Sequence, residues 1–286
     1  MARPTRFAQV AAWPIAALLA IVSLAGLVAR GTYAQERPAW AAEAVGQDWF
    51  DLLIAVPCLA ICGVRARAGS YRWNVLLAGA YAYVVYELAI YAFAVHFNAL
   101  FFAYCATLGL ASYALIASLG NLGLRPEPVE RGTARLAGGW LVALGGLFAI
   151  MWLVEDVPAV ERGLRPASLE ATGLVTNPVH VIDLSFVLPA HVIAGVLLWR
   201  RRAGGAVLAP VLLAFGVLMS ASIGGMMLAI RLAGGAGPIP VIVAMFIVTA
   251  ITAALLWRVL YVSVHTVREG LREDVRDPSQ GAPGRV

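Results

Sequence analysis

Residues 176–199 read TNPVHVIDLSFVLPAHVIAGVLLW, and this stretch decides the fold. Asn177 followed by Pro178 predicts a helix start, because an asparagine side chain caps free amides and proline fits the first helical turn. The run that follows is almost wholly apolar and continues to Trp199. At about 1.5 Å per residue it is long enough to cross a hydrocarbon core of about 30 Å. The stretch therefore predicts a transmembrane helix.

The rest of the chain repeats this pattern, which predicts an all-α polytopic membrane protein. Hydrophobic residues make up 61% of the 286 residues and charged residues 13%, an excess of apolar surface that one soluble core cannot hide. We expect one domain over residues 1–265 and a polar, disordered cytoplasmic tail over 266–286. The first apolar run is longer than a usual signal-peptide core and favours an anchor. About eight spans are expected, at 9–29, 49–64, 74–95, 99–119, 136–154, 178–199, 206–232 and 238–262.

The arginines predict the orientation. They gather at one set of span ends, and most acidic residues lie at the other set, so the positive-inside rule places both termini in the cytoplasm. All the basic residues are arginine, which indicates a GC-rich bacterial genome and hence the bacterial inner membrane. The net charge of +5 does not indicate a nucleic-acid partner, because the arginines sit at helix ends; the expected partner is the lipid bilayer.

One polar stripe lies within an apolar span. Tyr83 and Tyr91 are four residues either side of Glu87 and share its helix face. Asn98 returns to that face if the helix continues. An ionisable group inside a membrane span is costly, and burial favours its protonated form, so Glu87 is a candidate proton carrier. The alternative is a protonated glutamate that only locks two helices together.

A second polar group follows Asn177. His180 and Asp183 are three residues apart and can touch on one helix face, where an aspartate can orient an imidazole. His191 lies on the same face but about 16 Å deeper, too far to share a metal with His180. Pro189 should kink the helix between the two histidines. The alternative is a carboxylate that the helix dipole favours near the N-terminus.

Several span ends bring metal-ligating residue types to the outer side. We therefore expect a weak candidate metal site formed by His96, His180, Asp183 and Asp51, residue types that suit a divalent metal. Gly216, Ser220 and Gly224 form a small-residue face that predicts close helix packing and a possible helix-mediated oligomer. No internal repeat is apparent, so the sequence gives no argument from symmetry.

Four classes of function fit these residues. The favoured one is a small-solute or proton-coupled transporter or ligand-binding protein, with a polar pocket open to the outer face. The second is a metal-dependent intramembrane enzyme with a lipid-like substrate; the residue mix resembles alkaline ceramidases and adiponectin receptors, but their late HxxxH pair is absent, so no residue role is carried over. The others are a haem electron-transfer protein, with His96 and His180 as axial ligands, and a scaffold without chemistry. No cofactor is the default expectation.

Overall fold

The computed structural model describes residues 6–29, 31–124 and 126–262. The tail predicted over 266–286 lies outside these residues. The described part is helical, with the elements α1 (Phe7–Val28), α2 (Pro38–Phe50), η1 (Asp51–Ala55), α3 (Val56–Ala66), α4 (Tyr71–Ala94), α5 (Phe101–Gly123), α6 (Arg131–Arg162), α7 (Ala167–Thr172), α8 (Pro178–Ile182), η2 (Asp183–Val187), α9 (Leu188–Trp199), α10 (Ala203–Leu232), α11 (Ile239–Trp257) and η3 (Arg258–Val262). The elements labelled η are single π-helical turns.

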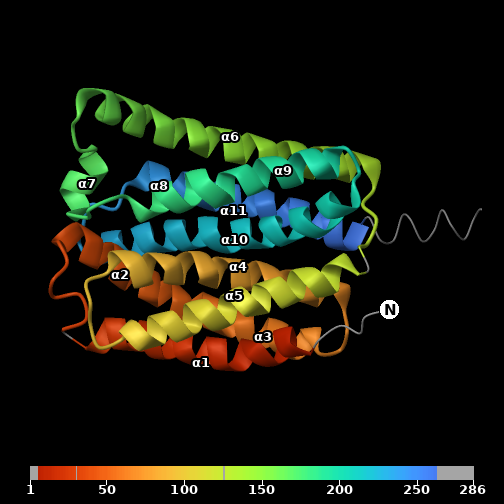
Figure 1. Ribbon diagram of the computed structural model, residues 1–286, viewed down its shortest axis with the longest axis horizontal. Helices are drawn as coiled ribbons and strands as arrows, with labels where there is room; N and C mark the ends of the chain where they lie inside the picture. The colour runs from red at the N-terminus through yellow and green to blue at the C-terminus, as the bar shows by residue number, and fades with distance from the viewer. Residues whose placement is uncertain (1–5, 30, 125, 263–286) are drawn as a thin grey trace, which may run out of the picture.

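Eight of the helical segments in the described ranges are long and apolar enough to cross a membrane, which confirms the predicted fold class. Three of these spans are composite: α2, η1 and α3 form the second, α8, η2 and α9 form the sixth, and α11 with most of η3 forms the eighth. Figure 1 shows the spans side by side along the long axis. The protein is therefore a multi-pass helical membrane protein.

The second span differs from its prediction. It begins at Pro38 and not near residue 49, because the polar side chains of Gln47, Asp48 and Asp51 turn inward and are buried. Residues 38–48, which precede the predicted span over 49–64, are thus the first part of a 29-residue span. Counting from Pro38 at about 1.5 Å per residue, Asp51 lies about 20 Å into the span instead of near its start.

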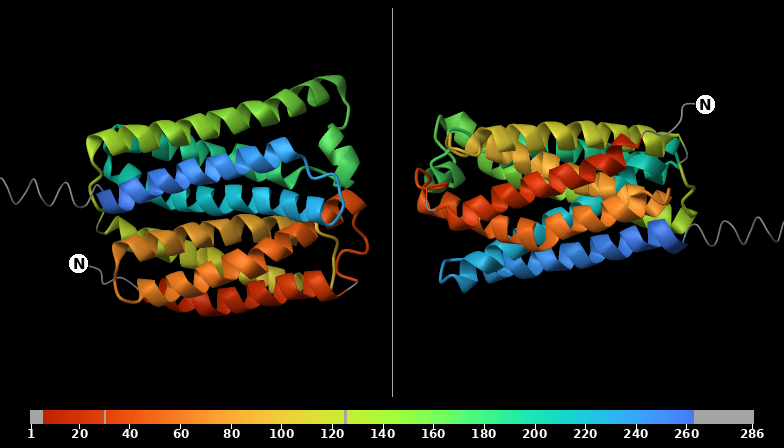
Figure 2. Two further views of the ribbon diagram at one scale, coloured as in Figure 1. Left: turned by 180° about the vertical axis from the view of Figure 1, so that it is seen from behind. Right: turned by 90° about the horizontal axis from the view of Figure 1, so that it is seen from below.

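The bundle has two halves. Helices α1 to α5 lie together on one side and α6 to α11 on the other, and the halves meet where α4 and α2 contact α10 (Figures 1 and 2). The helix α4 is central: most of its span is buried, and Leu77 and Tyr81 are fully enclosed.

The two halves are structural repeats, which corrects the sequence-based expectation of no internal repeat. The start of η1 precedes that of η2 by 132 residues, and the same offset separates the start of α3 from that of α9 and the start of α4 from that of α10. The turn between these spans contains a positive φ angle at equivalent residues, Gly69 and Arg201. With this offset, residues 51–91 align with residues 183–223, and eleven of the 41 aligned pairs are identical. The first-repeat members of the identical pairs are Asp51, Leu52, Pro57, Ile61, Gly63, Val64, Val75, Leu76, Ala82, Val85 and Ala89.

The repeats also share their helix contacts. A Cβ atom built on Gly63 would lie 2.6 Å from Ala12 of α1, and one built on Gly195 would lie 2.6 Å from the carbonyl oxygen of Gly138 of α6. Equivalent glycines thus let the second and sixth spans approach the first and fifth closely. Each repeat contains four spans, so both repeats have the same orientation in the membrane.

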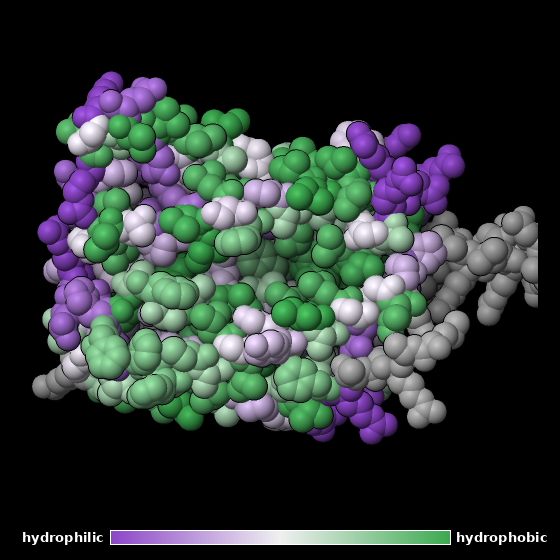
Figure 3. Space-filling view, in the orientation of Figure 1, coloured by the Kyte–Doolittle hydropathy of each residue, from purple (hydrophilic) through white to green (hydrophobic). Residues whose placement is uncertain are grey.

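The surface between the two ends of the bundle is mostly hydrophobic, and hydrophilic residues gather at the ends (Figure 3). The arginine-rich end carries the turns around Arg65, Arg131 and Arg200. The opposite end, here called the α7 end, carries most of the acidic loop residues. There the Arg37 side chain donates to the carbonyl oxygen of Glu170 at 2.5 Å and joins α2 to α7.

Candidate functional site

The first polar group is a buried network of acids and tyrosines. Asp48 of α2, Asp51 of η1 and Glu87 of α4 are 0%, 1% and 6% exposed. The Tyr83 hydroxyl donates to Asp51 Oδ1 at 2.5 Å, and the Gln47 amide donates to the same oxygen at 3.1 Å. The predicted stripe on α4 is therefore buried, and Tyr83 connects it to the second span.

Asp48 is held by two other tyrosines. The Tyr33 hydroxyl donates to Asp48 Oδ2 at 2.7 Å, and the Tyr91 hydroxyl donates to Asp48 Oδ1 at 3.0 Å. Tyr33 lies in the loop before α2, where burial and the nearby Asp48 raise its pKa above the ordinary range of a tyrosine. Gly26 of α1 closes the other side, since a Cβ atom built there would lie 1.8 Å from Asp48 Oδ2.

Ser222 of α10 connects this network to the other half of the protein. Its hydroxyl donates to Gln47 Oε1 at 2.6 Å, and the Gln47 amide in turn contacts the Tyr83 hydroxyl. Gly46 and Gly225 let α2 and α10 approach closely beside this contact. The seam between the second and seventh spans is therefore closed by packing and by polar contacts.

The second polar group surrounds Asp183. The Trp152 indole of α6 donates to Asp183 Oδ2 at 2.8 Å and stacks on the His180 ring with 4.2 Å between ring centroids. The His180 Nδ1 atom lies 3.0 Å from Asp156 Oδ2. His180 and Asp183 thus both contact Trp152. His180 pairs in addition with the carboxylate of Asp156. Tyr86 of α4 reaches Asp183 from the other half of the protein.

The other predicted residues lie apart from these groups. His96 pairs with Glu36 at 3.0 Å in the loop after α4. Asn98 does not extend the polar stripe, because α4 ends at Ala94; its side chain caps the turn before α5 through the Leu100 amide at 2.8 Å. His191 contacts the Val187 carbonyl oxygen at 2.7 Å and packs against Phe215.

The structure does not bring the predicted metal ligands together. His96, His180, Asp183 and Asp51 have separate partners, and within the described ranges no three His, Cys, Asp or Glu side chains are arranged to hold a metal ion. The small-residue face of α10 packs within the chain: Ser220 contacts Thr249 of α11 at 2.8 Å, and Gly216 and Gly224 lie against the same helix.

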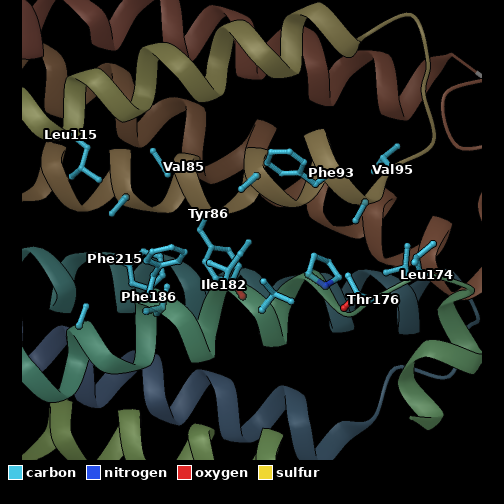
Figure 4. Close-up of a pocket in the computed structure, with 18 of the residues that line it drawn as sticks. Val85, Tyr86, Phe93, Val95, Leu115, Leu174, Thr176, Ile182, Phe186 and Phe215 are labelled. Carbon is cyan, nitrogen blue, oxygen red and sulfur yellow. The ribbon is translucent and has the colours of Figure 1, made fainter. Parts of the chain in front are cut away.

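A groove of about 790 Å³ lies between the halves. Its walls come from α4 and α5 on one side and from the α8–η2–α9 span and α10 on the other. Figure 4 shows Tyr86 reaching from α4 toward Ile182, with Phe186 and Phe215 beside them. The groove opens on the side of the bundle, where Figure 3 shows a hollow between the polar ends. Two of its lining residues, Phe93 and Phe186, are 83% and 72% exposed.

This groove differs from the polar outward-facing pocket that the sequence suggested. Nearly all its lining side chains are apolar; the polar ones are Tyr86, His96 and Thr176. The sequence analysis also omitted Gln47, Asp48, Tyr86 and Trp152 as site residues. A signal existed for Gln47, since it lies four residues before Asp51 on one helix face, but Tyr86 and Trp152 come from distant spans.

Comparison with family models, with curated proteins and with solved structures finds no match to this chain. The fold and the two polar groups define a multi-pass helical membrane protein of two four-span repeats, with a lateral groove where the repeats meet.

Proposed function

We propose that the protein is a transporter for a small lipid-soluble molecule that enters the groove from the bilayer. The observation that carries this proposal is the groove itself, an apolar space between two repeats of the same orientation. Transporters with parallel repeats hold their substrates at the repeat interface, close to interrupted helices. Here the interrupted sixth span lines the groove, and its π-helical turn begins at Asp183.

The chemistry of the groove indicates the class of substrate. A pocket of several hundred Å³ with apolar walls and few polar groups suits a ligand of drug-like size. Tyr86 lines the groove and contacts the buried Asp183 behind it, and a phenolic oxygen can accept a hydrogen bond from a ligand. A long-chain alcohol or a similar molecule with one hydrogen-bond donor fits this arrangement.

Photolabelling tests binding. A long-chain alcohol that carries a diazirine would be added to the full chain in liposomes and the labelled peptides identified by mass spectrometry. We expect labelling of α4 and of the α8–η2 segment, and its loss in Ala89→Trp, which fills the groove. The matched control is Ala106→Trp on the exposed face of α5, which should leave the labelling unchanged. Uniform labelling of all lipid-facing helices, unaffected by Ala89→Trp, would exclude groove binding.

Transport also requires the halves to move. Spin labels at Phe93→Cys and Phe186→Cys, in a background that lacks the native cysteines, report the width of the groove. We expect two distance populations that the alcohol shifts. The control pair Phe93→Cys and Tyr113→Cys lies within one half and should give one narrow distance. A single distance across the groove that the alcohol does not change would favour a static binding protein over a transporter.

The proposal keeps the predicted orientation. The arginine-rich end would face the cytoplasm of a bacterial cell, with the α7 end outside the inner membrane.

A further inference from the structure

The acid network in the first repeat has more carboxylate oxygens than donors that contact them. Asp48 accepts one hydrogen bond on each oxygen, from Tyr33 and Tyr91, and both contacts suit an ionised carboxylate. Asp51 accepts two hydrogen bonds on Oδ1, whereas its buried Oδ2 has no partner. Among the described residues, no donor contacts the Glu87 carboxyl. Two of the three acids thus have oxygen atoms without a donor.

Within the described ranges, no positive charge pairs with these acids. The ion pairs within the described ranges are His96 with Glu36 and His180 with Asp156, and both lie outside the network. The groups that face it from the surrounding elements are neutral donors or further acids: Tyr33 of the first loop, Gln47 of α2, Tyr83, Tyr86 and Tyr91 of α4, Tyr104 of α5, Ser222 of α10, and, at greater distance, Glu36 and Asp183.

Three ionised carboxylates cannot be held together in this place. Moving a charge into a low-dielectric interior without a partner is so costly that the group neutralises instead. Glu87 lies within electrostatic range of both Asp51 and Asp48, and like charges at close range favour protonation of one of them. The arrangement of the acids does not fit a metal ion, as described above. A proton bound to one of the acids reduces the charge without any further ligand.

We propose that Asp51 and Glu87 form a buried proton-binding site, with Asp48 as the neighbouring acid whose two oxygens both accept tyrosine hydrogen bonds. The proton resides on Glu87 or on the unpartnered Asp51 Oδ2, so no covalent bond other than O–H forms or breaks. This site lies in the first repeat, apart from the groove, and the inference does not depend on what the groove binds. Glu87 is next to Tyr86 in α4, so a change in its protonation acts on the helix that lines the groove.

Infrared spectroscopy tests the proposal directly. The full chain in liposomes should show a carboxylic acid C=O band at neutral pH, which identifies a protonated acid. We expect Glu87→Gln or Asp51→Asn to remove or shift this band. Glu161→Gln, which removes an exposed acid at the α7 end, is the matched control and should leave it in place. If the wild-type protein shows no protonated carboxyl at neutral pH, the proposal is overturned.

The dependence of thermal stability on pH gives a second readout, which is independent of the infrared spectrum. We expect the melting temperature of the wild-type protein to fall as the pH rises from neutral to alkaline and the site loses its proton. Glu87→Gln imitates the protonated state and should flatten this dependence, whereas Glu161→Gln should not. A melting temperature that rises with sodium, relative to potassium at equal ionic strength, would instead assign the site to a sodium ion and reject the proton. A failure of alcohol labelling in the groove leaves these outcomes unaffected.

Discussion

Asp51 and Asp183 occupy the same position in the two repeats: each is the first residue of a π-helical turn, and each precedes a proline by six residues, 57 − 51 and 189 − 183. Their surroundings differ because the residue equivalent to Tyr83 is Phe215, which has no hydroxyl. Asp51 is therefore enclosed by its own repeat, whereas Asp183 takes donors from α6 and α4 beside the groove. Equivalent positions in the two repeats thus have partners from one repeat in one case and from both repeats in the other.

The equivalent glycines give the first prediction. Gly63→Ala and Gly195→Ala should each destabilise the protein by about 1–3 kcal/mol, because the added methyl group overpacks a close helix contact. Gly195→Ala should cost more, since its nearest neighbour is the backbone oxygen of Gly138, whereas Gly63 faces the Ala12 side chain. The free energy of unfolding in a denaturing detergent titration measures both. Gly146→Ala is the control, because its added methyl group meets no atom within 4 Å; equal effects of all three variants would contradict the prediction.

Gly26 gives a second prediction, which tests the network around Asp48. Gly26→Ala should be strongly destabilising, by about 1–3 kcal/mol or more, because the new methyl group would occupy the place of Asp48 Oδ2. Gly109→Ala in α5 is the matched control, because its added methyl group meets no atom within 4 Å. It should be neutral or slightly stabilising, since alanine is the better helix former. A Gly26→Ala variant as stable as the wild-type protein would show that Asp48 does not lie against α1.

The sequence predicted the spans because each one is an apolar run long enough to cross a bilayer. It missed the start of the second span because Gln47, Asp48 and Asp51 look like loop residues when their partners are unknown. Those partners, Tyr33, Tyr83 and Ser222, come from a loop and two distant spans, and only tertiary structure brings them together. The sequence did not reveal the repeat because most of the aligned side chains are different apolar residues. The two repeats are related mainly by the positions of their helix interruptions.

Trp152 gives a prediction for the second polar group. Trp152→Phe keeps an aromatic ring against His180 but removes the indole N–H that donates to Asp183. A buried acceptor without its donor costs about 1–3 kcal/mol, so the variant should unfold at lower detergent concentration. Trp13→Phe on the exposed face of α1 is the control and should change stability little. If the two variants behave alike, the contact between Trp152 and Asp183 does not contribute to folding.

Cysteine labelling of intact cells tests the orientation. In a background without the native cysteines, Glu161→Cys at the α7 end should react with a maleimide that cannot cross the membrane. Ala68→Cys at the arginine-rich end should react only after the cells are permeabilised, because the positive-inside rule places that end in the cytoplasm. The reverse pattern would invert the topology, and equal labelling of both in intact cells would show that the cells leak.

Glu130 gives a prediction for the dependence of stability on pH. Its carboxylate caps α6 by accepting hydrogen bonds from the Gly132 and Thr133 amides at 2.6 and 2.7 Å, and these contacts lower its pKa below the ordinary glutamate value of 4.5. A group with a lowered pKa in the folded protein stabilises it fully above the ordinary value, and this contribution is lost as the pH falls through the folded value. Because the side chain lies at the surface, we expect the contribution to be less than about 1 kcal/mol. The difference in unfolding free energy between the wild-type protein and Glu130→Gln should therefore be constant from neutral pH to about 4.5 and shrink below it. The control variant Glu161→Gln should show no such change. A difference that grows as the pH falls would mean that Glu130 is not an ionised helix cap.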